Sequence, residues 1–290
     1  MKRLGVTVSA LALCLGLAVG GTPATAAWET KTVAQLAAGD PIRKLAILHA
    51  QEVFLEEMVL NACLVSAGIE ASTSRNAAYA ARDTFEATIG DIEKEVLALD
   101  DSVPAVRRLK REIGSKKDLW YRFRVVLERE LKAETPSPEA LSQIALVEEN
   151  LVGSIDRVYK VVKRKAMKSG QVDLGAAINE NQSFQRRYLA TKLVKSTCLV
   201  SAGIGDALAR AKLGEAIEHF DAQLASDAGS ILASEEIKAQ IAGWQAILPA
   251  LRDVAAGKPL DAGVIEEMQR LRSDWQQVVK NPAEGVVLRG

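Results

Sequence analysis

The feature that most constrains the fold of this chain is a block of seven residues that occurs twice. Cys63-Leu-Val-Ser-Ala-Gly-Ile69 returns letter for letter as Cys198-Leu-Val-Ser-Ala-Gly-Ile204, at an offset of 135 residues. The same offset relates four single identities, which are Val59 with Val194, Arg75 with Arg210, Phe85 with Phe220, and Ala87 with Ala222. Such self-similarity indicates that one structural unit has been duplicated along the chain.

Each copy is predicted to contain four helices. The chain has 20 Gly, 8 Pro and only 4% aromatic residues, a composition that favours helices over sandwiches and barrels. Helix caps such as Asp40-Pro41 and helix stops such as Gly68 divide the chain into segments. These segments lack the alternation of apolar and polar residues that is typical of strands. The predicted helices are 41–68, 72–99, 101–133 and 135–168 in the first copy, and 176–202, 206–225, 234–255 and 261–280 in the second. Pro249 should kink or shorten the helix over 234–255.

We therefore predict an all-α protein of two tandem up-down four-helix bundles related by internal duplication. Trp120 matches Trp244 at an offset of 124, so the second copy is 11 residues shorter than the first between these landmarks. The predicted divisions are a signal peptide over 1–27, a linker over 28–40, the first bundle over 41–170, the second over 171–281, and a tail over 282–290.

The first 27 residues resemble a secretory signal peptide. Lys2 and Arg3 precede an apolar run, and small residues near Ala26 and Ala27 suit cleavage at either position. The alternative is a retained membrane anchor, for which an apolar run of about 17 residues is short. We expect a periplasmic or secreted protein that does not span the membrane after cleavage.

Charge and motif content exclude several classes of function. Lys and Arg together number 37, as do Asp and Glu, and no long basic stripe of the kind that binds nucleic acid is present. His49 and His219 have no Cys or carboxylate at a zinc-binding spacing, and no serine has a suitably placed His as a base. We expect a non-enzymatic protein without a metal or other cofactor.

The helix that precedes the second repeated block carries a recognisable pattern of residues. Its sequence, Arg187-Tyr-Leu-Ala-Thr-Lys192-Leu-Val-Lys195-Ser-Thr-Cys198, resembles the first-helix motif of a sensory domain shared by type IV pilus methyl-accepting chemotaxis transducers and nitrate/nitrite sensor kinases. In that motif an Arg precedes Met-Leu-Ser-Gln-Arg-Met-Ala-Lys. Arg187, Lys192 and Lys195 match its basic positions, whereas Thr191 replaces the usual Gln.

The resemblance implies a periplasmic four-helix bundle that dimerises. In the nitrate sensors the leading Arg residues of the two protomers together bind one anion at the dimer interface. Two tandem copies would imitate such a dimer within one chain, with Arg187 at the position of that Arg in the second copy.

The first copy departs from the pattern because its equivalent residues are acidic. Glu52 stands where Arg187 stands in the second copy, Glu56 replaces Thr191, and Glu57 replaces Lys192. Two hypotheses follow. In one, Arg187, Lys192, Glu52 and Glu56 form a pocket for a zwitterionic or cationic ligand, or for an anion held by Arg187 alone. In the other, Glu52 and Arg187 form a structural salt bridge that fixes the pairing of the copies.

Cys63 and Cys198 occupy equivalent positions on the first helix of each copy. If these helices lie parallel and side by side, the thiols approach each other, and an oxidising compartment permits a disulfide. The alternative is a pair of buried free thiols that pack as small apolar residues.

The expected function is that of an exported sensory or ligand-binding protein. Its ligand would be a small anion or another small polar molecule bound between the repeats, and its partner would be a membrane receptor or an envelope protein. The alternative is a structural scaffold of the envelope that has lost ligand binding.

Overall fold

A computed structural model of the chain describes residues 41–97, 104–168, 174–204, 207–228, 235–258 and 263–273. These residues are helical apart from short turns, and the described part of the chain contains no strand, which confirms the predicted all-α class. The signal peptide, the linker and the tail predicted from the sequence lie outside the described residues.

Helix bounds agree with the predicted ones to within a few residues, because caps and glycine stops are local signals. The helices are α2 (Pro41–Ser66), α3 (Ala71–Leu97), α4 (Pro104–Lys132), α5 (Pro138–Lys168), α6 (Leu174–Ser201), α7 (Ala207–Ala228) and α8 (Glu235–Ala255), and residues 263–273 are also helical. Pro249 does not shorten α8, which continues to Ala255 as one helix.

The two copies of the repeated block end their helices in the same way. Gly68 and Gly203 have φ angles of 72° and 68°, a left-handed conformation that favours glycine. The amide of Ile69 donates to the carbonyl of Leu64 at 2.9 Å, and the amide of Ile204 donates to that of Leu199 at 2.8 Å. Identical residues thus form the same helix stop 135 positions apart.

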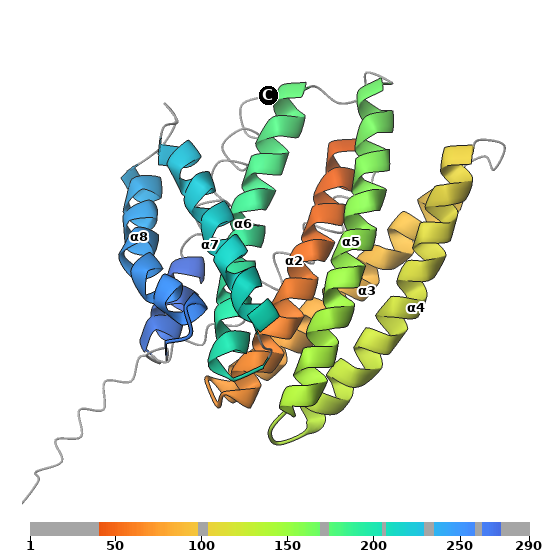
Figure 1. Cartoon of the computed structure of the whole chain (residues 1–290). Coiled ribbons are helices and arrows are strands. Elements are labelled where there is room, and N and C mark those ends of the chain that lie inside the picture. Colours follow the sequence, from red (N-terminus) through yellow and green to blue (C-terminus); the bar gives the residue numbers. More distant parts are fainter. Residues whose placement is uncertain are drawn as a thin grey trace, which may run out of the picture.

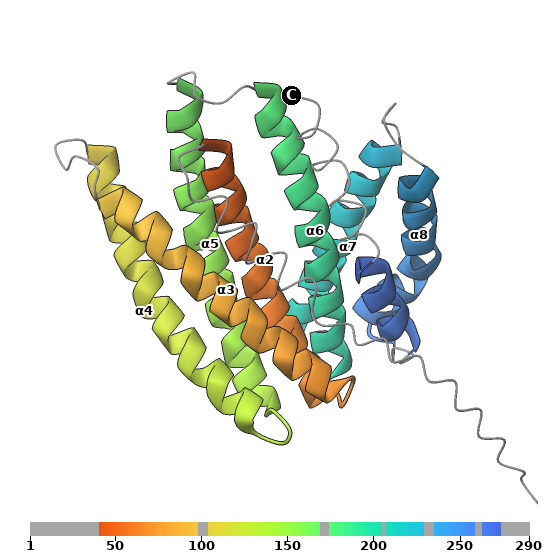
Figure 2. The same ribbon diagram turned by 180° about the vertical axis from the view of Figure 1, so that it is seen from behind.

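Helices α2, α3, α4 and α5 pack against one another in chain order, and α5 returns against α2 (Figures 1 and 2). In the second half, α6 contacts α7 and α8, and α7 contacts α8. The helix over 263–273 packs closely on α8, since a Cβ added at Gly243 would lie 2.6 Å from Cδ2 of Leu271.

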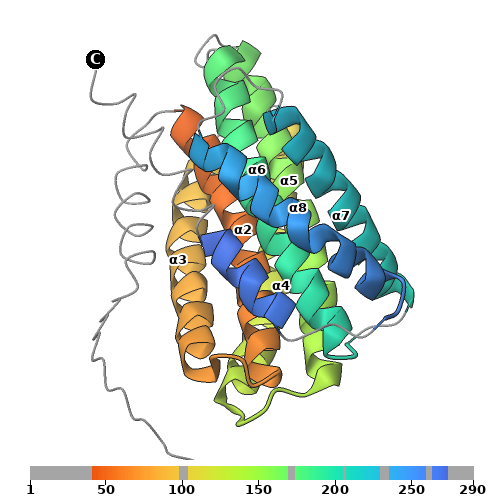
Figure 3. The same ribbon diagram turned by 90° about the vertical axis from the view of Figure 1, so that its left-hand side faces the viewer.

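The contact between α2 and α6, which we call the seam, joins the two halves (Figures 1 and 3). Cys63 lies against Cys198 and His49 against Phe184, so the helices run parallel with equivalent residues side by side. Both halves contribute to one apolar core, in which Phe54 and Val194 are fully buried. Within the described ranges, no helix is both long and apolar enough to cross a membrane.

Candidate functional site

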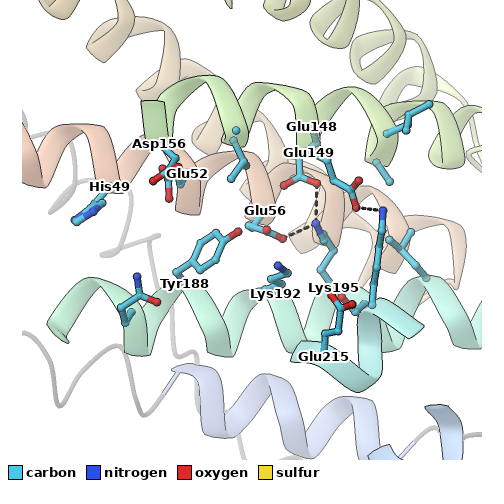
Figure 4. A pocket seen from close by; sticks show the side chains of 18 of the residues that line it. His49, Glu52, Glu56, Glu148, Glu149, Asp156, Tyr188, Lys192, Lys195 and Glu215 are labelled. Carbon is cyan, nitrogen blue, oxygen red and sulfur yellow. Dashed lines mark hydrogen bonds and ion pairs between the residues drawn. The ribbon is translucent and has the colours of Figure 1, made fainter. Parts of the chain in front are cut away.

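A cavity of about 850 Å³ lies beside the seam, between α5 and α6 (Figure 4). Helix α2 forms one wall of this central cavity, and the first turns of α7 contribute to its edge. Its charged and aromatic lining residues are His49, Glu52, Glu56, Glu148, Glu149, Asp156, Tyr159, Lys160, Lys163, Phe184, Tyr188, Lys192, Lys195, Lys212 and Glu215.

Helical periodicity explains why these residues face the same space. On α6, Phe184, Tyr188, Lys192 and Lys195 follow one another at intervals of four, four and three residues, which places them on one face. On α2, His49, Glu52 and Glu56 follow the same rule. The two faces point toward each other and toward α5 (Figure 4).

Lys195 forms the centre of a buried charge cluster. Its Nζ lies 2.6 Å from Oε2 of Glu56 on α2 and 2.7 Å from Oε2 of Glu148 on α5. Burial alone would lower the pKa of Lys195, but the carboxylates of Glu148 and Glu56 raise it above its ordinary value. Burial and the Glu56 carboxylate raise the pKa of Glu148 to about 8. At neutral pH the positive charge of Lys195 is therefore retained, and the pKa of Glu148 favours its protonated form.

Glu52 is the second acidic group of the cavity, and it has a different environment. The residue is only 6% exposed, and its carboxylate forms no hydrogen bond or ion pair with any residue in the described part of the chain. Burial, followed by the negative charges of Asp156 and Glu56, raises the pKa of Glu52 to about 8. Lys116 and Lys160 oppose this shift from a distance, without pairing with Glu52.

Most of the lysines that line the cavity already have a carboxylate partner. Lys160 pairs with Asp156 at 2.6 Å, and Lys212 pairs with Glu149. Two lysines differ, because among the described residues they face aromatic rings and no carboxylate. The Nζ of Lys192 lies 5.6 Å from the centroid of the Tyr188 ring, and that of Lys163 lies 5.4 Å from the centroid of the Tyr159 ring. Among the described residues, Glu52 is therefore a buried carboxyl group of the cavity without a partner, and Lys163 and Lys192 are ammonium groups without a carboxylate partner.

Aromatic side chains close the cavity on the side of Glu52. The His49 ring stacks on Phe184 at a centroid distance of 3.7 Å and lies 3.9 Å from Tyr159. His49 precedes Glu52 by three residues on α2, and Tyr159 follows Asp156 by three residues on α5. This cluster reduces solvent access to Glu52, which is consistent with the raised pKa of that residue.

The structure brings together three of the four predicted ligand-binding residues. Glu52, Glu56 and Lys192 line the cavity, whereas Arg187 does not. The Arg187 guanidinium lies 3.3 Å from Glu57 and 6.0 Å from the centroid of the Phe54 ring. The expected pairing of Arg187 with Glu52 is therefore wrong.

The geometry of parallel helices explains this correction. Equivalent residues of two side-by-side parallel helices are related by an approximate two-fold axis between them, so only residues on that axis meet. Arg187 also lies about 100° around α6 from its neighbour Tyr188, which faces the cavity. Glu52 and Arg187 are equivalent in sequence but lie on different sides of the seam.

Cys63 and Cys198 lie on the axis and do meet. The structure joins their sulfur atoms in a disulfide, with the Cα atoms 6.2 Å apart. Both residues are buried. A covalent link at this position ties the C-terminal ends of α2 and α6 together.

The sequence prediction missed the contribution of α5. Glu148 occupies a position in the buried stripe of that helix, between Ile144 and Leu151, where an apolar residue is expected. A charged residue within an apolar stripe is the signal that could have identified it. Asp156 gave no such signal, because it is only partly buried.

Among the described residues, no group of three His, Cys, Asp or Glu side chains is arranged to hold a metal ion. Comparison of the chain with protein-family models, with curated proteins and with solved structures gives no match. The residues of the cavity are therefore the basis for any assignment of function.

Proposed function

We propose that this chain is an exported, non-enzymatic ligand-binding protein that holds a small polar molecule in the central cavity. In this proposal the chain is a duplicated pair of four-helix bundles, and the cavity lies where the first bundle meets the second. The observation that carries the proposal is Glu52, a buried carboxylate that faces the cavity without a partner.

A carboxylate in this position lowers the stability of the folded state. Burial of an unpaired ionisable group is unfavourable, and strongly shifted pKa values are concentrated at functional sites. A purely structural interface does not require such a group, because a glutamine or an apolar residue at this position would lower the stability of the folded state less. A ligand that donates hydrogen bonds to Glu52 would offset this penalty when it binds.

The sensory part of the proposal rests on the resemblance of the Arg187–Cys198 segment to the input domain of chemotaxis transducers and nitrate sensors. Lys192 and Lys195 occupy basic positions of that motif and both line the cavity. In this proposal the protein reports ligand binding to a membrane receptor or an envelope protein. The acidic first copy supports a ligand other than the anion for which the family motif is suited.

The second candidate function is that of an envelope scaffold. The observation that favours it is the seam itself, which is closed by the Cys63–Cys198 disulfide and by the Arg187–Glu57 pair. These contacts hold the copies together without a ligand. The two candidates differ in what they predict for Glu52.

The test is the Glu52→Gln variant, assayed by thermal unfolding with and without added compounds. The compounds are nitrate, nitrite, small carboxylic acids, small amines and the common amino acids. At least one should raise the Tm of the wild-type protein, because a ligand that binds only the native state stabilises it. The same compound should leave the Tm of Glu52→Gln nearly unchanged.

The same variant gives a second readout that needs no ligand. Because the pKa of Glu52 is raised from 4.5 to about 8, the folded state keeps a proton that the unfolded state releases between these pH values. The stability that this group contributes is complete below pH 4.5 and is lost as the pH rises through 8. Gln cannot ionise, so Glu52→Gln should exceed the wild type in stability by on the order of 2 kcal/mol or more at pH 8.5, and by little at pH 5.

Glu57→Gln is the matched control, since Glu57 lies on the same helix but outside the cavity. This variant should keep the ligand response of the wild type. If no compound shifts the wild-type Tm and Glu52→Gln gains no stability at pH 8.5, the scaffold function is the correct one.

A further inference from the structure

We infer that the ligand is an α-amino acid, whose ammonium group is bound by Glu52 with Asp156 and whose carboxylate is bound by Lys192. This inference rests on the proposed function and gives it a chemical class of ligand. It follows from a buried carboxyl group, Glu52, and an ammonium group, Lys192, that line one cavity without a partner of opposite charge among the described residues.

The acidic end suits a primary ammonium group. Glu52 on α2 and Asp156 on α5 lie next to each other at one end of the cavity (Figure 4). Asp156 pairs with Lys160 through Oδ2, and its Oδ1 can accept from a ligand while this pair is kept. An ammonium group has three N–H donors, and ionised carboxylates are acceptors only. A ligand ammonium between them would favour the ionised form of Glu52, would give it the partner that it lacks, and would reduce its repulsion by Asp156 and Glu56.

The basic end suits a carboxylate. Lys195 is already bound by Glu56 and Glu148, and Lys212 by Glu149, so neither is available without breaking an ion pair. Lys163 and Lys192 hold no carboxylate among the described residues, and Lys163 lies over Tyr159, in the aromatic cluster beside Glu52, so Lys192 is the lysine available at the other end. An incoming carboxylate at this ammonium group breaks no existing ion pair.

The distance between the two ends fits a short zwitterion. In the register of the seam, Glu52 is level with Arg187, so Lys192 lies five residues further along. At a rise of about 1.5 Å per residue, the two levels are about 7.5 Å apart along the helix. The N–Cα–C link of an α-amino acid spans about 2.5 Å, and two charge-assisted hydrogen bonds of about 2.8 Å each bring the total to about 8 Å, which is close to this separation.

Ligands with only one charge fit less well. A lone carboxylic acid would satisfy Lys192 but leave Glu52 buried and unpaired, in a cavity that also contains Glu56 and Asp156. A lone amine would satisfy Glu52 but leave Lys192 without a counter-ion. The aromatic cluster of His49, Tyr159 and Phe184 beside Glu52 offers an apolar surface to the ligand side chain.

The experiment is isothermal titration of the full mature chain with the twenty common amino acids. For the amino acid that binds most tightly, the matched amine without the carboxylate and the matched acid without the amine are then titrated. For leucine these are 3-methylbutylamine and 4-methylpentanoate. The amino acid should bind at least tenfold more tightly than either analogue.

Variants then assign each end of the ligand. Glu52→Gln should lower the affinity for the amino acid at least tenfold and leave the affinity for the matched acid unchanged. Lys192→Gln should lower the affinity for the amino acid at least tenfold and leave the affinity for the matched amine unchanged. Arg187→Gln is the control on the same helix as Lys192, and it should bind as the wild type does. Unfolding curves confirm that each variant is folded.

The outcomes separate this inference from the proposed function. If the acid alone or the amine alone binds as tightly as the amino acid, the zwitterion inference is overturned and the proposed function stands. The same holds if no amino acid binds but nitrate, nitrite or another compound raises the Tm in a Glu52-dependent way. If nothing binds, both are overturned.

Discussion

Helices α2 and α6 end in the same seven residues, the same helix stop and opposite halves of one disulfide, yet one turn earlier they have little in common. Lys195 of α6 corresponds to Leu60 of α2, and Glu56 of α2 corresponds to Thr191 of α6. The buried ion pair of Glu56 and Lys195 therefore lies on one side of the seam only, since Thr191 and Leu60 stand at the equivalent positions. The comparison shows that the residues shared by the two helices set their register, whereas the residues that differ make the two sides of the seam unequal.

The largest effect should come from making the two sides alike at Lys195. Replacing Lys195 with Leu, the residue at the equivalent position 60, removes the partner of Glu56 and Glu148 and leaves both carboxyl groups buried. Removal of one member of a buried ion pair lowers stability by about 3 to 5 kcal/mol. Urea denaturation at pH 7 measures the change.

The double variant Glu56→Thr with Lys195→Leu sharpens this test, since it copies both residues of the opposite side. Glu148 can keep its proton in this variant, so no buried charge is left without a partner. We expect the double variant to recover at least half of the stability lost by Lys195→Leu alone. No recovery would mean that packing, rather than unpaired charge, causes the loss.

The second largest loss of stability should come from removal of the disulfide, whose two cysteines belong to the repeated seven-residue block. Replacing Cys63 and Cys198 with Ala removes a link between residues 135 positions apart and should lower the free energy of unfolding by about 2 to 4 kcal/mol. The disulfide itself is checked by mass spectrometry of the non-reduced mature chain, which should lack two hydrogens relative to the reduced chain. Two free thiols on the intact protein would contradict it, and Cys14→Ala is the control because Cys14 lies in the predicted signal peptide.

The smallest effect should come from the side opposite the cavity. Arg187→Ala removes a partly exposed ion pair with Glu57 at 3.3 Å, for which a loss of about 1 kcal/mol or less is typical. A double-mutant cycle by urea denaturation should find coupling between Arg187 and Glu57 and none between Arg187 and Glu52. Coupling between Arg187 and Glu52 would contradict this expectation and support the Glu52–Arg187 salt bridge hypothesised from the sequence.

The sequence predicted the helices well because their ends depend on neighbouring residues. Pro138 begins α5 and Gly68 follows the end of α2, and both signals act within one helical turn. The cavity was only partly predictable because it depends on which side of the seam each residue faces. Glu52 and Arg187 are equivalent in the alignment of the copies, and equivalence was mistaken for contact.

The sequence repeat does not predict which residues of α5 face the cavity. Glu148 and Asp156 lie at the cavity only because α5 returns against α2 and continues beside α6 (Figure 4). Comparison of the first helices of the two copies contains no information about this third helix. An inspection of buried stripes for charged residues would have found Glu148, but only the packed structure pairs it with Lys195.

The parallel register of the seam also determines how the occupancy of the cavity would depend on ligand concentration. A symmetric dimer of identical domains has two equivalent half-sites, so its occupancy can depend on which subunit is filled first. Here both halves belong to one chain, and the cavity draws different residues from each. One asymmetric site per chain should give a 1:1 stoichiometry and a simple hyperbolic titration with a Hill coefficient of about 1.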